Sequence, residues 1–272
     1  MTVDPEVLAY YERRDEETRH QSGPSQLEAV RTKILIQKHA PPAPTTVLDI
    51  GGAAGAYAFW LTEQGYTVHL LDPAERLIEE ARRRNDSASF PLASCDVGDA
   101  RTLPFETGSA DVVLLLGPLY HLTTPADRAA ALSEAARVLK PGGILFAAAI
   151  SRWASLLDGA ARNLFGSPDH WPLVERTIQS GQNRNPDGRV GGFTTAYFHT
   201  PNELCTEVNN SGFGLLGIYA IEGFAGFLPD FEQRWADPRQ RDDLLRVAEL
   251  LQSEPALLGA TPHLLAVGQR AA

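Results

Sequence analysis

The sequence has few of the residues that build disulfide frameworks or basic surfaces. Cys95 and Cys205 are its two cysteines, and their contexts are unrelated, so they predict neither a disulfide framework nor a thiolate metal site. The 24 lysines and arginines are outnumbered by 34 aspartates and glutamates, which gives a formal net charge of -10. Binding to a phosphate backbone needs clustered basic residues, so this balance argues against a nucleic-acid partner.

Long apolar runs are also missing. No stretch approaches the roughly 20 apolar residues that cross a bilayer, and residues 1–17 are rich in charge without the apolar centre of a signal peptide. We therefore expect a cytoplasmic protein that does not enter a membrane. Its 272 residues, 43% of them hydrophobic, suffice for one large domain with added segments. The oligomeric state stays open between a monomer and a homodimer.

The most informative stretch is a glycine-rich turn between a buried strand and a helix. Residues 47–50 are apolar enough for a short strand, and residues 54–64 carry apolar side chains at helical spacing, with Gly65 as a stop. A strand, a glycine turn and a helix together direct backbone N–H groups and a helix N-terminus at a ligand. Glycine serves there because it has no Cβ to block a close approach.

This turn resembles the first motif of the class I S-adenosylmethionine-dependent methyltransferases, which is acid-x-Gly-x-Gly-x-Gly. Here it runs Asp49-x-Gly51-x-Ala53-x-Gly55, with Gly52 inside it and alanine at the middle glycine. The resemblance implies S-adenosyl-L-methionine as cofactor and S-adenosyl-L-homocysteine as product. A nicotinamide-binding turn is similar, but its Gly-x-Gly-x-x-Gly pattern fails here.

An acidic residue follows the second expected strand. Residues 67–71 form that strand, and Asp72-Pro73 comes directly after it. An acid in this place can accept hydrogen bonds from both hydroxyls of a ribose. It can also cap the helix that Pro73 opens, since proline is favoured in the first turn of a helix. Both roles are compatible, and with the first motif present we favour the ribose role.

A second family segment follows a weaker strand over residues 90–95. The stretch Gly98-Asp99-Ala100-x-x-Leu-Pro-Phe resembles a segment in which the acid binds the adenine amino group. The next backbone N–H in that segment reaches a ring nitrogen. The resemblance thus implies these roles for Asp99 and Ala100, with Asp96 as the alternative if the register slips by one turn.

The fourth expected strand, residues 110–116, ends where a reactive methyl group should point. Open α/β sheets bind ligands at the carboxyl ends of their strands, which places Leu116 at the cofactor. The following Gly117-Pro118-Leu119-Tyr120 lacks the leading Asn or Asp of family members that methylate nucleic-acid amino groups. A small-molecule acceptor is therefore favoured, with Tyr120 and His121 as acceptor-binding residues. His121 is also the leading candidate for a general base.

Two helices, expected over residues 4–18 and 26–39, precede this core. In the methyltransferases that the chain resembles, such a segment folds over the cofactor as a lid. Tyr10, Tyr11, Arg19 and Arg31 are then candidates for contacts with the methionine end of the cofactor. Simple packing of these helices on the core is the alternative explanation for them.

The end of the chain supports the same family. Arg137-Val-Leu-Lys-Pro-Gly-Gly, which enters a fifth strand over residues 144–150, is the most specific resemblance. A late helix over residues 200–212 and strands over 215–221 and 263–267 fit an antiparallel hairpin. The predicted fold is therefore α/β and Rossmann-like: a doubly wound, seven-stranded sheet, mostly parallel, with an antiparallel C-terminal hairpin.

We divide the chain into four regions on this basis. They are lid helices over 1–44, a cofactor-binding core over 45–150, a cap insertion over 151–199, and the rest of the core over 200–272 with a second insertion at 222–260. Trp153, Tyr197 and His199 in the first insertion are expected to bind the acceptor, and His199 and Tyr197 are further catalytic candidates. We also expect several aromatic residues of the two insertions to line the acceptor pocket, with a small secondary core as the alternative for the others. The candidates are Trp153, Phe165, Trp171, Phe193, Tyr197, Phe224 and Phe227.

The function expected from the sequence is methyl transfer from S-adenosylmethionine to an O, N or C nucleophile of a small molecule, with secondary metabolism as one setting. Histidine, cysteine and carboxylate residues show no spacing typical of a metal site, so we predict none. Two alternatives remain at this stage: a nicotinamide-dependent oxidoreductase, and a non-catalytic cofactor-binding protein of the same fold.

Overall fold

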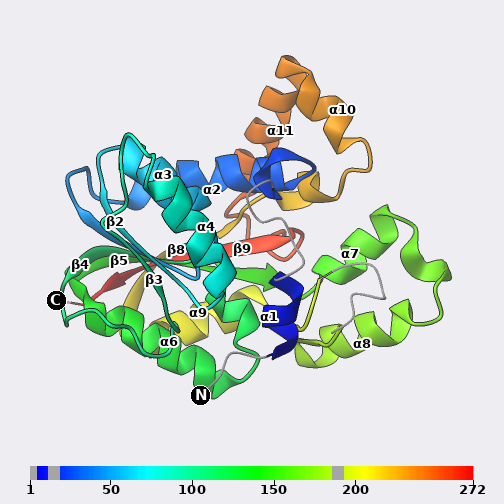
Figure 1. Cartoon of the computed structure of the whole chain (residues 1–272). Helices are drawn as coiled ribbons and strands as arrows, with labels where there is room; N and C mark the ends of the chain where they lie inside the picture. The colour runs from blue at the N-terminus through cyan, green and yellow to red at the C-terminus, as the bar shows by residue number, and fades with distance from the viewer. Residues whose placement is uncertain (1–4, 12–18, 186–192, 272) are drawn as a thin grey trace.

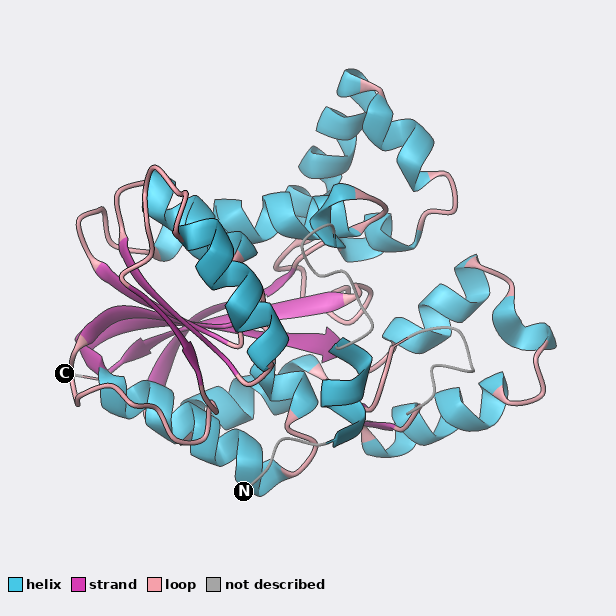
Figure 2. Ribbon diagram, viewed as in Figure 1, coloured by secondary structure: helices cyan, strands magenta, loops and turns pink. Residues whose placement is uncertain are grey.

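The computed structural model describes residues 5–11, 19–185 and 193–271, which form a sheet with helices on both faces (Figures 1 and 2). Five parallel strands run in the order β3-β2-β1-β4-β5. They are β1 Thr46–Ile50, β2 Thr67–Asp72, β3 Ser94–Val97, β4 Ala110–Leu115 and β5 Leu139–Ser151. The third strand starts later than predicted, because Phe90 is 57% exposed and the chain enters the sheet only at Ser94.

The last two long strands give the sheet an antiparallel ending. β9 (His263–Arg270) pairs antiparallel with β5, and β8 (Phe213–Ala220) pairs antiparallel with β9. The predicted seven-stranded, mostly parallel sheet is therefore confirmed. Two short strands were not expected: β7 (Ala196–His199) joins β5 beyond the end of β4, and β6 (Gln182–Asn183) pairs with β7.

Helices bury both faces of this sheet, which explains why β1 and β4 are apolar on both sides. On one face lie α2 Ser25–His39, α3 Ala56–Glu63 and α4 Glu75–Asn85. On the other face lie α5 Pro118–His121, α6 Pro125–Val138 and α9 Pro201–Asn210. Each face has its own buried apolar cluster, so the sheet separates two halves of the core.

Local signals fix the ends of the helices on the second face. Thr124 accepts a hydrogen bond from the N–H of Asp127, and proline follows as the first residue of α6. α9 begins with a reciprocal capping box between Thr200 and Glu203. The Arg137 motif is also structural: its guanidinium donates to the carbonyl oxygens of Leu103 and Phe105 at 2.9 and 2.8 Å. It therefore holds the loop that carries Asp99.

Additional helices surround the carboxyl ends of the parallel strands (Figure 1). They are α1 Pro5–Tyr11, η1 Arg19–Gln21, α7 Ala154–Ala161, η2 Leu164–Gly166, α8 His170–Ser180, η3 Gly223–Phe227, α10 Phe231–Ala236 and α11 Pro238–Leu251. The first of the predicted leading helices is present as α1, whereas residue 4 and residues 12–18 lie outside the described residues. None of the described helices is long and apolar enough to cross a membrane.

Candidate cofactor and acceptor site

The turn after β1 has backbone conformations that favour glycine. Gly51 and Gly55 have φ angles of 71° and 83°, and a Cβ on Gly51 would lie 2.7 Å from the ring of Pro118. Ala53, which replaces the middle glycine of the motif, is also left-handed, with φ of 51°. Its N–H donates to Oδ2 of Asp72 at 2.8 Å. That hydrogen bond holds the alanine in a conformation that most side chains avoid.

Asp72 connects this turn to the next unit of the fold. While Oδ2 accepts from Ala53, Oδ1 accepts from the N–H of Ala74 at 2.8 Å. The second bond forms an Asx turn ahead of α4, so the capping alternative describes part of its role. Each oxygen of a carboxylate can accept a further hydrogen bond. Asp72 also lines the cavity described below, which leaves the ribose role compatible with the turn.

Asp99 lies at the far side of the same cavity and is held by an arginine. Nε and Nη2 of Arg101 lie 2.9 and 2.5 Å from its two oxygens, and Nη1 of Arg101 reaches Asp127 at 2.8 Å. These contacts lower the pKa of Asp99 against the opposing effect of burial, so it stays ionised near neutral pH. Asp96, the alternative residue, is exposed and does not belong to the described cavity lining.

These residues share one cavity of about 410 Å³ at the carboxyl ends of the parallel strands. Its volume lies in the usual range for small-molecule sites. The following predicted cofactor residues line it: Asp49, Gly51, Gly52, Ala53, Asp72, Pro73, Asp99, Ala100, Leu116 and Tyr11. The predicted acceptor residues Tyr120 and His121 also line it. The structure therefore brings together residues that the sequence spreads over more than a hundred positions.

The burial of the Asp49 carboxylate indicates what kind of ligand group the cavity can bind. Its side chain is 1% exposed, and neither carboxylate oxygen has a hydrogen-bond partner among the described residues. Burial, with the charge of Asp72 added, raises the pKa of Asp49 to about 7. A buried carboxylate of this kind favours a cationic ligand group. The cavity thus offers acceptors for a cationic amino-acid end, for ribose hydroxyls and for an adenine amino group, so the residues fit this cofactor.

The helix α1 closes one side of the cavity. Val7, Leu8 and Tyr11 line it, and the Tyr11 hydroxyl lies 2.7 Å from Nε2 of His121. Arg76 of α4 donates to the backbone carbonyl of Tyr11 at 2.8 Å. At the other end of the helix, Thr195 donates to Glu6 at 2.6 Å. Three separate parts of the fold therefore hold α1 over the ligand space.

His121 is at the cavity, but its proton affinity does not suit a base. Burial, with the charge of Arg19 added, lowers the pKa of His121 to about 3. Its ring stacks on Phe193, with centroids 5.5 Å apart, and it shares a hydrogen bond with Tyr11. A neutral imidazole of this kind forms part of the cavity wall and is hydrogen-bonded to α1.

The other two catalytic candidates, His199 and Tyr197, lie away from the cavity. Nε2 of His199 is 3.2 Å from a carboxylate oxygen of Glu207, and the guanidinium of Arg128 lies 3.8 Å above the Tyr197 ring. Arg128 is itself 1% exposed and pairs with Glu207 at 2.8 Å. These residues connect α6, β7 and α9, and neither His199 nor Tyr197 is in the described cavity lining.

Three further predicted contacts are also placed elsewhere. Arg31 is buried and donates to Gln252 at 2.6 Å, which links α2 to the chain after α11. Trp153 packs where Gly259 leaves space, since a Cβ there would lie 2.5 Å from its ring. Gly55 lies beneath the turn, against Leu70, instead of at the described cavity surface. Their assigned roles as ligand contacts therefore have no support from their positions.

The prediction that the aromatic residues of the insertions line the cavity is wrong. None of the seven belongs to the described lining, and Phe193 packs behind two lining residues, His121 and Tyr120. Phe165 and Trp171 stack on one another with centroids 4.4 Å apart, and Trp171 is 45% exposed. Phe224 is 59% exposed. These rings form small secondary contacts on the helical additions, as side chains outside a main core often do.

The cavity is also lined by residues that the sequence did not single out. They are His20, Glu28, Thr32, Tyr57, Ile221 and His263. They come from η1, α2, α3 and the two antiparallel strands, so no local motif contains them. The one available signal was Glu28, a charged residue between the apolar Leu27 and Ala29 on a helix that packs against the core.

The comparison with protein families identifies the core. The family described as "Methyltransferase domain" matches residues 48–147, from β1 into β5. A ubiquinone/menaquinone biosynthesis C-methyltransferase from Roseobacter denitrificans is 36% identical over 109 residues, covering 39% of this chain and 42% of the relative. An uncharacterised methyltransferase from Mycobacterium bovis is 34% identical over 105 residues, covering 39% of this chain and 40% of the relative. The chain thus spans less than half the length of these curated relatives.

Solved structures extend the likeness of fold to most of the chain. A S-adenosylmethionine-dependent methyltransferase from Methanosarcina mazei aligns with a TM-score of 0.59 at 19% identity, covering 87% of this chain and 97% of that chain. One from Mesorhizobium loti gives 0.59 at 17% identity, covering 90% and 100%. The [4+2]-cyclase SpnF gives 0.55 at 14% identity, covering 90% and 80%. The fold is shared with enzymes of more than one named activity.

Proposed function

Because residues 48–147 form a methyltransferase domain of the class I, S-adenosylmethionine-dependent type, we propose that the chain transfers a methyl group from S-adenosylmethionine to a small-molecule acceptor. The product of the cofactor is then S-adenosylhomocysteine. The observation that carries the proposal is the cavity that joins the glycine turn, Asp72 and Asp99 to side chains of α1, α2 and the β8–β9 hairpin. The acidic net charge supports a small-molecule acceptor over a nucleic acid.

The residues of the cavity divide the binding work in this proposal. Asp49 faces the cationic amino-acid end of the cofactor, Asp72 accepts from the ribose, and Asp99 accepts from the adenine amino group. When bound, the cofactor supplies a methyl group that its sulfonium has already activated. The remaining task of the protein is to orient the acceptor and to exclude water.

The lid contributes the exclusion of water. In the proposal, α1 and the Tyr11–His121 contact cover the reacting atoms after both ligands have entered. Holding two reactants in line supplies roughly 7–11 kcal/mol of the barrier in favourable cases. The antiparallel β8–β9 ending supports a methyltransferase over a nicotinamide-dependent oxidoreductase, whose domain would continue with parallel units.

A retention experiment tests the cofactor. The full chain is incubated separately with labelled S-adenosylmethionine and with NADH, and each mixture is passed through a desalting column. We expect S-adenosylmethionine to elute with the protein and NADH to be lost. Retention of NADH alone would contradict the proposal and favour the oxidoreductase. Binding of S-adenosylmethionine without turnover on any acceptor would leave a non-catalytic protein or another reaction on the same fold.

A further inference from the structure

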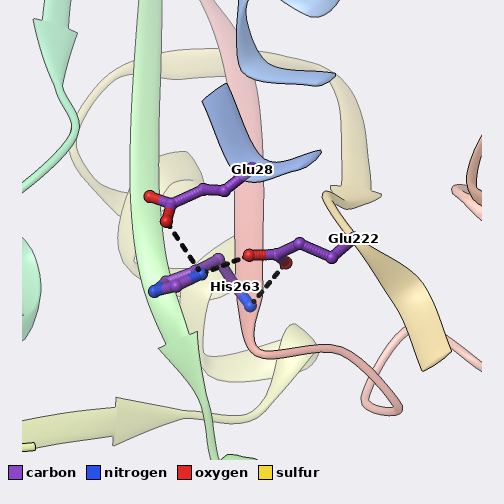
Figure 3. A group of neighbouring side chains, drawn as sticks. All are labelled: Glu28, Glu222 and His263. Atoms are coloured by element: carbon purple, nitrogen blue, oxygen red, sulfur yellow. Dashed lines mark hydrogen bonds and ion pairs between the residues drawn. The ribbon is translucent and has the colours of Figure 1, made fainter. Parts of the chain in front are cut away.

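The cavity contains a histidine, His263, that is held in place by the buried carboxylate of Glu222. Nδ1 of His263 lies 2.6 Å from Oε1 of Glu222, and the backbone N–H of His263 donates to Oε2 at 3.1 Å (Figure 3). The hydroxyl of Thr261 lies 3.0 Å from the same Oε2. Glu222 is 1% exposed. Its carboxylate is therefore locked in place and holds one face of the imidazole.

This arrangement leaves the other ring nitrogen of His263 for the cavity. Figure 3 shows Nε2 on the side of the ring away from both Glu222 and Glu28. Because the carboxylate favours a proton on Nδ1, Nε2 of the neutral ring carries the lone pair. His263 is a lining residue of the cavity that also contains Asp49 and Gly51. The nitrogen that can accept a proton is thus on the free edge of the ring.

The topology of the sheet explains why a residue so late in the chain reaches the site. β9 runs antiparallel to β5, and His263, its first residue, pairs with Ile150 near the carboxyl end of β5. Glu222 follows β8 at the same edge. That edge is where the parallel strands present their ligand site. The antiparallel hairpin therefore brings His263 to the cavity and places Glu222 behind it.

Two carboxylates and one guanidinium lie around His263, so its surroundings carry a net charge of about -1. Oε2 of Glu28 on α2 lies 3.9 Å from Nδ1, while Nη2 of Arg19 lies 2.8 and 2.9 Å from the two oxygens of Glu28. His20 is the remaining titratable neighbour, and burial lowers its pKa to about 4, so it is neutral. Burial opposes the charge on His263, but Glu28 and Glu222 outweigh it and raise the pKa of His263 to about 9.

The same three side chains also resemble a cation site, since Glu28, Glu222 and His263 each offer a ligand atom within 4.8 Å of the others. Their contacts favour another role. Nδ1 of His263 already shares its hydrogen with Glu222, and both oxygens of Glu28 are taken by Arg19. A divalent cation would have to displace an arginine and break the shortest bond of the group.

On the basis of the proposed function, we propose that His263 is the general base for the acceptor, that Glu222 positions it, and that the acceptor is a phenol or enol hydroxyl. The acceptor O–H gives its proton to Nε2 while its oxygen forms the new bond to the methyl carbon. The S–CH₃ bond breaks and its electron pair stays on sulfur, which leaves neutral S-adenosylhomocysteine. The imidazolium then releases the proton to water.

The side chains that line the cavity and the proton affinity of His263 together indicate the class of acceptor. A phenol has a pKa of about 10, close to that of His263, so the transfer is nearly balanced. An aliphatic alcohol resembles water, whose pKa of about 15.7 makes the same transfer unfavourable by several units. The lining adds Tyr57, Ile221 and Tyr120, which suit a flat, mostly apolar molecule.

The test uses two variants and a matched control on the full chain. A cell extract is incubated with methyl-labelled S-adenosylmethionine, and the methylated product is isolated and its methyl position assigned by NMR. With that acceptor, we expect His263→Gln to lower kcat by ~10²–10⁴-fold, with the calorimetric affinity for S-adenosylhomocysteine unchanged. His39→Gln, which removes a histidine bonded to Tyr219 outside the described cavity lining, should retain full turnover.

The pH profile separates a base from a residue that only supports the wall. Only the neutral imidazole accepts a proton, so the kcat/KM of the wild type should rise with pH up to about 9. Glu222→Gln keeps the shape of the hydrogen-bonding side chain but removes its negative charge, which lowers the pKa of His263. The pH at which kcat/KM reaches its plateau should therefore fall by about one unit. Imidazole NMR titration with bound S-adenosylhomocysteine reports the same shift without turnover.

Distinct results would overturn the inference. They are a methyl group on nitrogen or carbon, full turnover in His263→Gln, or an unchanged pH limb in Glu222→Gln. Loss of activity in EDTA that Mg²⁺ restores would assign the cluster to a cation instead. Each of these leaves methyl transfer itself intact. Absence of S-adenosylmethionine binding in the wild type is the separate result that would remove the proposed function.

Discussion

At the scale of single residues, Asp72 has the clearest expected effect on cofactor affinity. Asp72→Ala removes the proposed acceptor for the ribose hydroxyls and the two hydrogen bonds that link Ala53 and Ala74 to this side chain. Hydrogen bonds to charged groups contribute about 1.5–3 kcal/mol each, so S-adenosylhomocysteine should bind at least tenfold more weakly. Calorimetry measures the change.

Asp96→Ala is the matched control, because Asp96 is an exposed carboxylate on the neighbouring strand β3. The affinity of this variant for S-adenosylhomocysteine should equal that of the wild type. Equal affinity in Asp72→Ala would remove its ligand role.

Replacing Asp49 should stabilise the ligand-free chain above neutral pH and weaken cofactor binding. Its pKa is about 7 in the folded protein and lies near 3.8 for the free side chain, because burial and Asp72 disfavour the charge. A raised folded-state pKa favours the fold at low pH, and that contribution is lost as the pH rises through about 7. Asp49→Asn has no charge to bury, so its Tm at pH 8 should exceed that of the wild type by several degrees, and the gap should close at pH 5.

The same variant should bind the cofactor less well, since it lacks the negative charge for a cationic group. Differential scanning calorimetry of the ligand-free chain and titration with S-adenosylmethionine give the two quantities independently. A lower Tm at pH 8, or an affinity equal to that of the wild type, would show that the Asp49 carboxylate is needed for packing and not for the ligand.

At the scale of elements, α1 is the part expected to move. Its N-terminal turn depends on Glu6, which accepts from Thr195 at 2.6 Å and pairs with Arg184 at 3.0 Å. Glu6→Ala should loosen the lid, because the helix is then held mainly through Tyr11. An exposed ion pair and a partly buried hydrogen bond of this kind contribute about 1 kcal/mol, so S-adenosylhomocysteine should dissociate roughly fivefold faster.

Stopped-flow displacement measures this rate, with Glu79→Ala on the exposed side of α4 as the matched control. The stability of the chain should hardly change, since the affected contacts lie at the surface. An unaltered dissociation rate would mean that α1 packs on the core without gating the ligand.

The sequence predicted the core elements well because their signals are local. The glycine turn, the acid after β2 and the capping box of α9 each lie within a few consecutive residues, and helical or strand periodicity gave the rest. β6 and β7 were missed, because two- and four-residue strands have no periodicity to detect. β3 was placed too early because the apolar Phe90 suggested a strand but is exposed.

The acceptor site could not be predicted in the same way. Glu28, Glu222 and His263 meet only through the packing of α2 against the antiparallel hairpin, across more than two hundred residues. His199 and Tyr197 looked suitable from their position after an insertion, but β7 directs them at Arg128 and Glu207. Aromatic residues of the insertions stack in pairs, Phe165 on Trp171 and Phe231 on Trp235, instead of lining the cavity. Tertiary placement, which a motif does not encode, decides these cases.

At the scale of the whole molecule, the segments before and after residues 48–147, which match the methyltransferase domain, contribute further helices and the antiparallel strands β8 and β9. A cavity of about 410 Å³ lies at the carboxyl edge of the sheet. The helical lobes α7–α8 and α10–α11 project from that side of the sheet (Figure 1). The described lining comes from the N-terminal segment, the core and the β8–β9 hairpin. Substitutions in these helical lobes should therefore affect the stability of the chain and ligand access more than the contacts with the cofactor.

An assay of methyl transfer by the full chain is the most direct test of the proposed function. The protein is supplied with methyl-labelled S-adenosylmethionine and a small-molecule extract, and label and S-adenosylhomocysteine are followed together by mass spectrometry. We predict that a labelled small molecule appears in step with S-adenosylhomocysteine, and that Asp72→Ala at the same subsaturating cofactor concentration slows both at least severalfold. S-adenosylmethionine that binds with micromolar affinity yet keeps its methyl group in every extract would contradict the central claim.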